Sequence, residues 1–364
     1  MSASLAVEAL TLTLGAFRLN QIDFALARGE ILVILGPNGA GKSVTLETIA
    51  GFHRPDSGRV LIGGSEVTAL PPERRNIGFV VQNFGLFPHL TVAQNVAIAR
   101  RSDRAIAVPD STFPAHGDPA ALLSYFGVAH LAKRMPAALS PGEKQRVALA
   151  RALASVPDVF LFDEPFSALD ADMREQLREE LNTFLRALAI PAILVTHDRG
   201  DAIALADKIM VLRDGAVVQS GAATEVFRKP ISSFVARFVG VENVLPGRIV
   251  ETTENGISIE VGKQIVGAAR GQSMPAGRPI VVSIHAEDVA VSLPEGERQK
   301  SAINRFAGRV TAMRRAGALV TIAIDCGFPL RAFLLGPQVR EMGLDVGSGV
   351  AVQIAPEAVH IMAD

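Results

Sequence analysis

The chain has 364 residues, and its 36 Lys and Arg against 37 Asp and Glu give a formal net charge of −1 at pH 7. This balance gives no electrostatic case for binding nucleic acid, and the single cysteine, Cys326, excludes an internal disulfide. The length is sufficient for two domains, and no apolar run approaches the roughly 18 residues that a membrane-spanning helix needs.

Two segments near the N-terminus, Leu10–Leu14 and Ile22–Leu26, alternate apolar and polar residues at the period of a β-strand. Phe17 lies between them. It either packs in the core or offers an aromatic face on which adenine stacks, and the pattern alone favours the core.

The segment Gly36–Ser43 fits the phosphate-binding pattern G-x-x-x-x-G-K-[ST]. The apolar run Ile31–Leu35 precedes it and predicts a buried parallel strand, and a helical pattern follows to about Ala50. We expect the backbone N–H groups of this loop and the helix N-terminus to bind phosphates. Lys42 would contact the β- and γ-phosphates, and the Ser43 hydroxyl would ligate Mg²⁺.

Three further apolar runs end in polar residues: Ile77–Val81 at Gln82, Asp158–Phe162 at Asp163 and Glu164, and Ala192–Val195 at Thr196, His197 and Asp198. Because α/β sheets place ligands at the carboxyl ends of their strands, we expect these side chains near the nucleotide. Acids at the end of an apolar strand are costly unless they are paired or bind a metal, so Asp163 is the candidate Mg²⁺ ligand. Taken alone, Gln82 is typical of a solvated turn and His197 of a structural histidine.

The segment Leu139–Gln145 opens a helix that is predicted to run to about Ala154. Ser140 is a good N-cap, Pro141 fits the first helical position, and Glu143 completes a capping box. A well-formed helix start explains this segment by itself, although a helix N-terminus also binds anions.

The remaining pattern up to residue 238 alternates helices with strands, which is typical of an α/β domain. Residues 102–119 contain three prolines and predict a surface loop. The other predicted helices are Ala120–Phe126, Leu131–Arg134, Met173–Leu188, Arg199–Ala206 and Ala223 to about Phe238.

Beyond Val241 the helical periodicity ends, and short strands with glycine turns predict a small all-β domain. Two pairs of segments repeat within it: Asn243–Val250 with Asn304–Thr311, and Gly277–Val291 with Gly347–Ile361. Each copy is too small to bury much core alone, so we predict that two small barrels pack together. The predicted domains are 1–238 and 239–364, the latter with repeats at about 243–292 and 302–362.

The first two-thirds of the chain resembles the ATP-binding subunit of ABC transporters. Six motifs carry the resemblance: the Walker A loop at Gly36–Ser43, the Q-loop at Gln82, the signature at Leu139–Gln145, the end of Walker B at Asp163 and Glu164, the D-loop at Ser167–Asp170 and the switch histidine at His197. The resemblance implies a P-loop ABC nucleotide-binding domain with a helical subdomain. It also implies that the chain hydrolyses ATP with Mg²⁺.

The resemblance also implies a role for each residue. Glu164 would be the general base for the attacking water, His197 would contact the γ-phosphate, and Gln82 and Asp163 would join Ser43 at Mg²⁺. Nucleotide contacts are implied for Phe17, Gly36, Pro37, Asn38, Gly39, Ala40, Gly41, Lys42, Ser43, Val44, Ser140 and Gly142. The signature of this family binds ATP held by the opposite subunit, so a homodimer is implied.

The C-terminal repeat resembles the paired oligonucleotide-binding-like (OB-like) domain of import ATPases. Three runs, Lys42–Gly51, Leu86–Leu90 and Ser301–Asn304, are similar to molybdate and tungstate importers, although Ile303 stands where that subfamily has Arg. This implies an ATPase that energises import of molybdate or tungstate. Importers of ferric iron, sulfate or polyamine are alternatives, and a soluble ABC ATPase outside transport is a remote one.

The implied partners are integral-membrane permease subunits and, through them, a periplasmic or extracellular substrate-binding protein, with no nucleic acid. The chain would then lie at the cytoplasmic face of the inner membrane as a peripheral subunit. The segment Asn83–Leu90 is the predicted permease contact because its apolar side chains have no amphipathic helix to cover them. The C-terminal domain would either bind the oxyanion, through Ser301, Asn304 and Arg305, or act only as a structural dimeriser.

Overall fold

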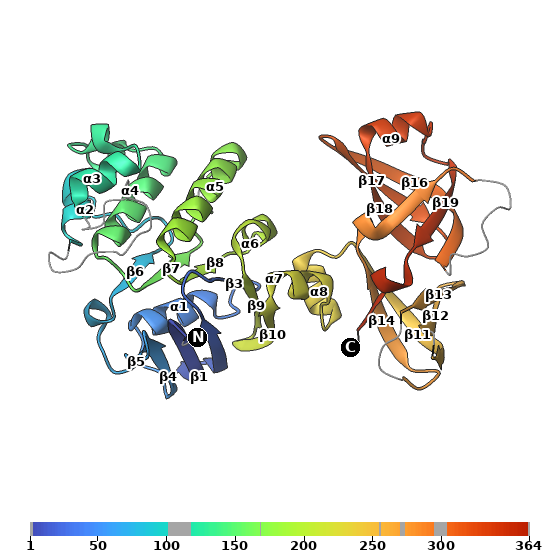
Figure 1. Ribbon diagram of the computed structural model, residues 1–364, viewed down its shortest axis with the longest axis horizontal. Coiled ribbons are helices and arrows are strands. Elements are labelled where there is room, and N and C mark those ends of the chain that lie inside the picture. The colour runs from blue at the N-terminus through green and yellow to red at the C-terminus, as the bar shows by residue number, and fades with distance from the viewer. Residues whose placement is uncertain are drawn as a thin grey trace. The chain divides into compact units, whose positions relative to one another are not determined.

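The computed structural model describes residues 3–100, 118–167, 169–254, 256–269, 274–294 and 304–362. The chain divides into two compact units, residues 1–223 and 224–364 (Figure 1). Nearly all of the predicted surface loop at 102–119, and residues 301–303 of the Ser301–Asn304 run, lie outside the described residues.

A ten-stranded sheet forms the centre of the first unit, in the order β5-β4-β1-β2-β10-β9-β3-β8-β7-β6. Its strands are β1 (Leu5–Leu14), β2 (Phe17–Leu26), β3 (Ile31–Leu35), β4 (Ser57–Ile62), β5 (Ser65–Glu66), β6 (Ile77–Val80), β7 (Val159–Asp163), β8 (Ala192–Val195), β9 (Lys208–Arg213) and β10 (Ala216–Ala222). Strands β9, β3, β8, β7 and β6 pair in parallel. Every residue of β3, β7 and β8 is buried, which explains their continuous apolar sequences.

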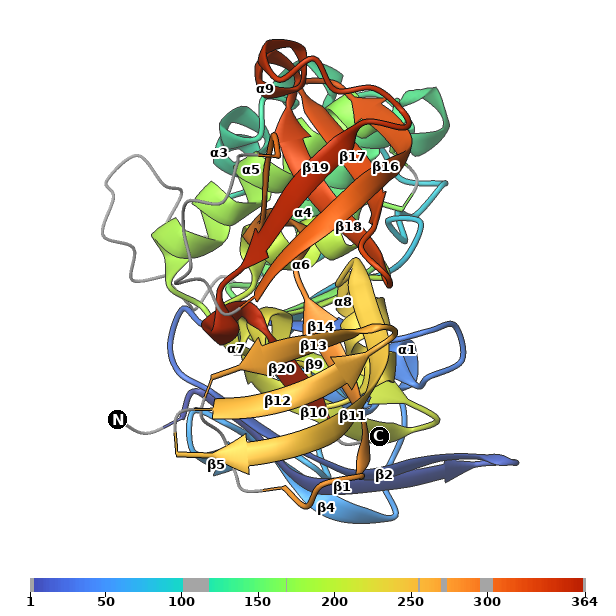
Figure 2. The ribbon, with the colours of Figure 1, turned by 90° about the vertical axis from the view of Figure 1, so that its right-hand side faces the viewer.

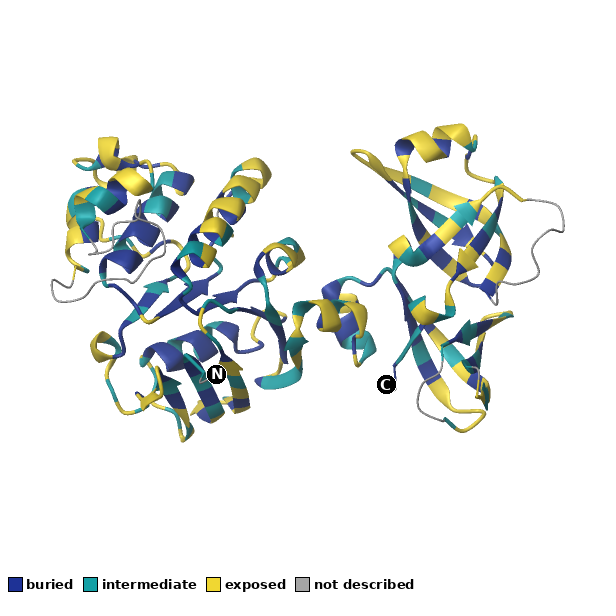
Figure 3. Ribbon diagram, viewed as in Figure 1, coloured by how far each residue is buried: buried dark blue, intermediate teal, exposed yellow. Residues whose placement is uncertain are grey.

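The helices of this unit begin at polar caps or glycine turns that the sequence contains. They are α1 (Lys42–Ala50), α2 (Val92–Ala97), α3 (Pro119–Tyr125), α4 (Pro141–Ala154), α5 (Ala171–Leu188) and α6 (Arg199–Leu205), with 3₁₀ turns η1 (Pro72–Arg74), η2 (Ala129–Leu131) and η3 (Pro136–Ala138). Helices α2, α3 and α4 pack together as a helical subdomain (Figure 1). Helix α5 buries one side and exposes the other (Figure 3). The predicted helix Leu131–Arg134 is wrong, because η2 ends at Leu131.

The single helix predicted over Ala223 to about Phe238 is also wrong. Two short helices occupy this region, α7 (Ala223–Arg228) and α8 (Ser233–Val239). Pro230 lies between them, and proline lacks the N–H that a continuous helix would need there. The Ser232 side chain accepts a hydrogen bond from the Val235 N–H and so starts α8. Helix α8 belongs to the second unit, within which it contacts β11 and β14.

The second unit contains two five-stranded sheets, ordered β13-β12-β11-β14-β20 and β15-β19-β16-β17-β18 (Figure 2). The elements are β11 (Asn243–Thr253), β12 (Gly256–Val261), β13 (Gln264–Ala268), β14 (Pro279–Ile284), η4 (Ala286–Asp288), β15 (Val289–Ser292), β16 (Asn304–Ala316), β17 (Leu319–Asp325), β18 (Pro329–Leu335), α9 (Gly336–Glu341), β19 (Gly349–Ile354), η5 (Pro356–Ala358) and β20 (His360–Met362). The repeat seen in the sequence corresponds to β11, β14, η4 and β15 in the first copy and to β16, β19, η5 and β20 in the second.

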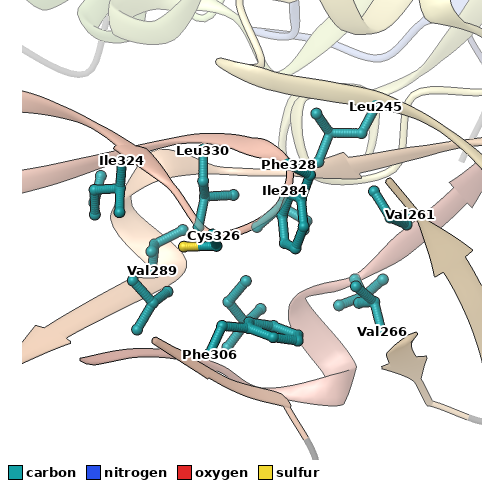
Figure 4. Packing of buried hydrophobic residues seen from close by; sticks show 14 of the residues in the cluster. Leu245, Val261, Val266, Ile284, Val289, Phe306, Ile324, Cys326, Phe328 and Leu330 are labelled. Carbon is teal, nitrogen blue, oxygen red and sulfur yellow. The ribbon is translucent and has the colours of Figure 1, made fainter. Parts of the chain in front are cut away.

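The two repeats exchange their last strands. Strand β15 of the first repeat pairs with β19 of the second, and β20 of the second repeat pairs with β14 of the first. Both sheets therefore contain residues of both repeats, and a single apolar cluster runs between them. Phe306 and Phe328, for example, pack edge to face within it (Figure 4).

Candidate nucleotide-binding site

A pocket of about 640 Å³ opens in the first unit beside the carboxyl ends of the parallel strands. Its lining comes from the aromatic at the start of β2, the phosphate-binding loop and the ends of three strands: Phe17, Asn38, Gly39, Gly41, Lys42, Ser43, Val44, Gln82, Glu164 and His197. Each of these residues was predicted to contact the nucleotide or to act on it. The fold thus brings together segments that are up to 180 positions apart in the sequence, from Phe17 to His197.

The phosphate-binding loop needs its glycines for two physical reasons. Gly39 and Gly41 have φ values of 79° and 100°, in the left-handed region that side chains disfavour. Gly36 passes so close to β9 that an added Cβ would lie 2.5 Å from the Leu212 carbonyl oxygen. The loop then enters α1 at Lys42, so the helix N-terminus faces the pocket. This arrangement can bind phosphate through backbone N–H groups.

The Lys42 ammonium is buried at the base of this loop, with 6% of the residue exposed. Its Nζ donates to the carbonyl oxygens of Gly36 and Pro37 at 2.8 and 3.0 Å. Burial lowers the pKa of Lys42, whereas the nearby carboxylates of Glu164 and Asp163 act to raise it. The loop therefore holds a positive charge where the phosphates of a nucleotide would bind.

The predicted Mg²⁺ ligands Ser43 and Asp163 contact each other. The Ser43 hydroxyl donates to Oδ1 of Asp163 at 3.1 Å, and burial raises the pKa of the Asp163 carboxyl. No group of three or more His, Cys, Asp or Glu suited to a metal occurs among the described residues. One carboxylate and one hydroxyl still fit Mg²⁺, which usually takes few protein ligands together with substrate phosphates.

The Glu164 carboxylate is contacted from two neighbouring strands. Its Oε1 lies 3.1 Å from Nδ1 of His197, and its Oε2 accepts from Nε2 of Gln82 at 3.4 Å. The pairing of β6 with β7 and of β7 with β8 explains this, because Val80, Phe162 and Leu194 are aligned partners shortly before the three polar residues. Gln82 thus contacts the predicted base directly, a relationship that the sequence did not indicate.

Phe17 combines the two roles that the sequence left open. Its ring lines the pocket, and it also packs against the core cluster of this unit. An added Cβ at Gly41 would lie 2.6 Å from Cζ of Phe17, so the ring also touches the phosphate-binding loop.

The signature residues Ser140 and Gly142 do not line this pocket. Ser140 caps α4, and the Glu143 carboxylate accepts from its backbone N–H at 2.7 Å and its hydroxyl at 2.9 Å. These two hydrogen bonds lower the pKa of Glu143. Gly142 is buried against Met173, whose Sδ would lie 2.6 Å from an added Cβ. Their predicted contact with ATP of a second subunit stays a prediction.

The segment Asn83–Leu90 exposes only some of the apolar side chains expected there. Phe84 is buried, which corrects its assignment to the exposed surface, and Arg151 of α4 donates to its carbonyl oxygen at 3.0 Å. Phe87 is 41% exposed. Its backbone N–H donates to Oδ1 of buried Asn95 at 2.8 Å, and its carbonyl oxygen accepts from Nδ2 at 3.1 Å. An exposed aromatic ring is thus held on a fixed backbone.

Two asparagines at corresponding repeat positions link the repeats of the second unit. Asn243 bonds through its amide to the backbone of Arg331, and Asn304 bonds to the N–H and carbonyl of Gly267 at 2.6 and 2.7 Å. Asn304 is fully buried and its amide is bonded to the Gly267 backbone, so the structure gives it a structural role, and its predicted role as an oxyanion donor stays a prediction. Of the other predicted donors, Arg305 is exposed and Ser301 lies outside the described residues.

Comparison with known proteins identifies the fold and activity. The ABC transporter family model matches residues 19–167. The molybdate/tungstate import ATP-binding protein of Pyrococcus horikoshii is 36% identical over 98% of this chain and 99% of its own. The chain belongs to the ATP-binding subunits of import-type ABC transporters. The sulfate/thiosulfate import ATP-binding protein CysA 2 of Chromobacterium violaceum is also 36% identical to this ABC ATPase, over 97% of the chain and 94% of its own.

A solved structure supports the same conclusion for the first unit of the ABC ATPase. It is the dimeric, post-hydrolysis state of an ATP-binding cassette bound to ADP and Pi, with a TM-score of 0.51 and 29% identity over 60% of this chain and 98% of its own. The predicted P-loop ABC fold followed by a small all-β region, and the prediction of an ATPase, are therefore confirmed. Among the described helices, none has both the length and the apolar character to cross a membrane.

Proposed function

We propose that this ABC ATPase energises the import of molybdate or tungstate. The support is that molybdate/tungstate import proteins of Pyrococcus horikoshii, Pyrococcus abyssi and Thermococcus kodakarensis are 34 to 39% identical to it. The first two of these relatives align over 98% of the chain, so the similarity includes the C-terminal unit as well as the ATPase.

In the proposed reaction, Glu164 accepts the proton of the water that attacks the γ-phosphorus, and the bond to the β-phosphate oxygen breaks. His197 and Gln82, which both contact this carboxylate, orient it. Lys42 and the loop N–H groups bind the phosphates, and Phe17 offers a face for the adenine. Ser43 and Asp163, with Gln82 of the same pocket region, would hold Mg²⁺, which when bound supplies charge that neutralises the phosphate oxygens.

Two further contacts belong to the proposal. A second copy of the chain would present Ser140 and Gly142 to the nucleotide, so that the active form is a homodimer. Permease subunits, which receive cargo from a substrate-binding protein, would dock on the exposed ring of Phe87 and place the ATPase at the cytoplasmic face of the membrane.

The alternative cargoes are sulfate, ferric iron and polyamine. Import proteins named for these cargoes are 34 to 40% identical to the chain, a range that overlaps that of the molybdate/tungstate relatives. The deciding experiment reconstitutes the ATPase with its permease in vesicles and measures ATP hydrolysis with cargo-loaded binding protein. We expect molybdate or tungstate to stimulate hydrolysis and the other cargoes not to do so. If sulfate, ferric iron or spermidine alone stimulated hydrolysis, that compound would be the cargo and the proposal of molybdate or tungstate would be wrong.

A further inference from the structure

The residues on either side of His197 belong to a buried hydrogen-bond network behind the catalytic pocket. Thr196 is 3% exposed, and its hydroxyl makes two hydrogen bonds. It donates to Oδ2 of Asp201 at 2.6 Å and accepts from the Asp198 N–H at 3.0 Å. The Thr196 hydroxyl therefore fixes the backbone directly after His197, at Asp198, and connects this backbone to Asp201 on α6.

A buried ion pair supports that hydroxyl. Asp201 is 2% exposed, and its Oδ1 accepts from Nε and Nη2 of Arg178 on α5 at 3.1 and 2.8 Å. Burial raises the pKa of the Asp201 carboxyl, whereas Thr196 and Arg178 act to lower it. A buried carboxylate is tolerated when its oxygens are bonded in this way, so the acceptor for Thr196 has a fixed position.

The turn after His197 is fixed from α5 as well. Oδ2 of Asp198 accepts from Nη1 of Arg174 at 2.8 Å, and its Oδ1 accepts from the Gly200 N–H at 2.7 Å. An added Cβ at Gly200 would lie 3.0 Å from Asp198 Oδ1 and 3.3 Å from Arg178 Nη2, so there is little room for the turn to move.

The His197 side chain itself is 56% exposed, and among the described residues its ring bonds only to Glu164. Its direction therefore depends on its backbone rather than on side-chain packing. We propose that Thr196 is a positioning residue for ATP hydrolysis, which aims His197 at Glu164 through the buried Arg178–Asp201 pair. Small displacements of a group at the reacting centre are costly, so removing the hydroxyl should slow turnover without weakening nucleotide binding.

The test compares Thr196→Val, which keeps the shape but removes the hydroxyl, with Thr196→Ser, which retains it. We expect Thr196→Val to lower kcat by up to roughly 100-fold, the loss that a displacement of about 1 Å at the reacting centre can cause. KM for ATP should stay unchanged, because the phosphate-binding loop is untouched, and Thr196→Ser should recover most of the lost kcat. Should Thr196→Val fail to fold, Thr196→Ala, which inserts no methyl groups, replaces it with the same expectation.

Thr48→Val is the matched control, since Thr48 is fully buried and its hydroxyl donates to the Val44 carbonyl oxygen at 2.6 Å within α1. It should lower the melting temperature without changing kcat.

A double-mutant cycle of Thr196 and His197, measured by single-turnover hydrolysis, separates positioning from general stability. If the two residues act through one group, the effects of their substitutions are not additive. Thr196→Val should cost little in a His197→Ala background. The proposal is overturned by a normal kcat for Thr196→Val, by Thr196→Ser being as slow as Thr196→Val, or by multiplying effects in the double variant.

Discussion

Glu164 and His197 contact each other at the carboxyl ends of β7 and β8, with Oε1 of the carboxylate 3.1 Å from Nδ1 of the ring. The other carboxylate oxygen accepts from Gln82 at 3.4 Å. Glu164 also has a φ of 45°, in the left-handed region that non-glycine residues seldom adopt. Its side chain is therefore directed by an uncommon backbone conformation and by contacts from the strands on both sides.

Glu164→Gln tests the base directly. The amide keeps the shape but cannot accept the proton of water, so we expect turnover to fall by about 10²–10⁴-fold, the usual contribution of a positioned base. Nucleotide binding should persist, because the phosphate-binding loop and Lys42 are unchanged. Steady-state hydrolysis and equilibrium binding of a fluorescent ATP analogue measure the two quantities. Hydrolysis near the unsubstituted rate would show that another group accepts the proton.

Phe17→Ala separates stacking from packing. Because the ring lines the pocket, its removal should weaken ATP binding by about 1–3 kcal/mol, the range for one stacking platform. Phe24→Ala is the control, since Phe24 packs against the same core cluster but is absent from the pocket lining. Calorimetric titration with ATP and thermal unfolding should show lost stability in both variants and lost affinity only in Phe17→Ala. Equal losses of ATP affinity in Phe17→Ala and Phe24→Ala would indicate that Phe17 acts only as a core residue.

Pro141→Gly tests the start of the signature helix. Proline at this position has no N–H to donate to a phosphate, whereas glycine provides one. We expect more ATP-dependent dimer on size exclusion in a Glu164→Gln background. The capping box of Ser140 and Glu143 remains and should preserve the helix start. An unchanged dimer fraction would mean that Pro141 has no influence on closure.

Phe87→Glu tests the proposed permease contact. A carboxylate in place of the exposed ring should release the ATPase from membranes that contain the permease, while hydrolysis by the free protein continues. Ile203→Glu places the same charge on α6, at a side chain that is 69% exposed, and should leave membrane association unchanged. Co-sedimentation with vesicles measures both variants. If the Phe87→Glu variant still sediments with the vesicles, the permease contact must lie on another part of the surface.

Substitutions at Asn304 and at Arg305 should affect different properties of the second unit: its stability in the first case and any anion binding in the second. The Asn304 amide bonds to the Gly267 backbone in a buried site, so Asn304→Ala should cost about 1–3 kcal/mol in the free energy of unfolding. Arg305 is exposed, so Arg305→Ala should leave stability unchanged and reduce any heat of molybdate or tungstate binding to the full chain. Denaturant unfolding and calorimetry measure these effects. Absence of binding heat in the unsubstituted protein would favour a purely structural role.

The clustering of Ser43, Gln82, Glu164 and His197 was predictable because each of their motifs follows a strongly apolar strand, while their roles toward a nucleotide stay predictions. Runs such as Ile31–Leu35 and Ala192–Val195 are observed with the predicted bounds. Parallel pairing then brings their carboxyl ends together, which is a general property of α/β sheets. The contact of Gln82 with Glu164 was not predictable in this way, because it depends on side-chain directions that strand periodicity does not determine.

Other features depended on long-range partners. Phe84 looked as exposed as Phe87 in the sequence, but Arg151, 67 positions away, bonds to its carbonyl oxygen. Thr196 and Asp201 read as ordinary polar residues near a helix start, and only Arg178 of the preceding helix makes their network complete. Pro230 was a local indication that the helix is interrupted, and the prediction of one long helix did not take it into account.

The exchange of β15 and β20 has a consequence for how the second unit can fold and how it could have arisen. A single repeat of this kind would leave the edge of β14 or β19 without its neighbour, because the missing strand belongs to the other copy. Only a second molecule could complete an isolated half, as a symmetric pair with swapped ends. Joined in one chain, the halves form their sheets together, so a truncation after the first repeat should yield no stable monomer of that repeat.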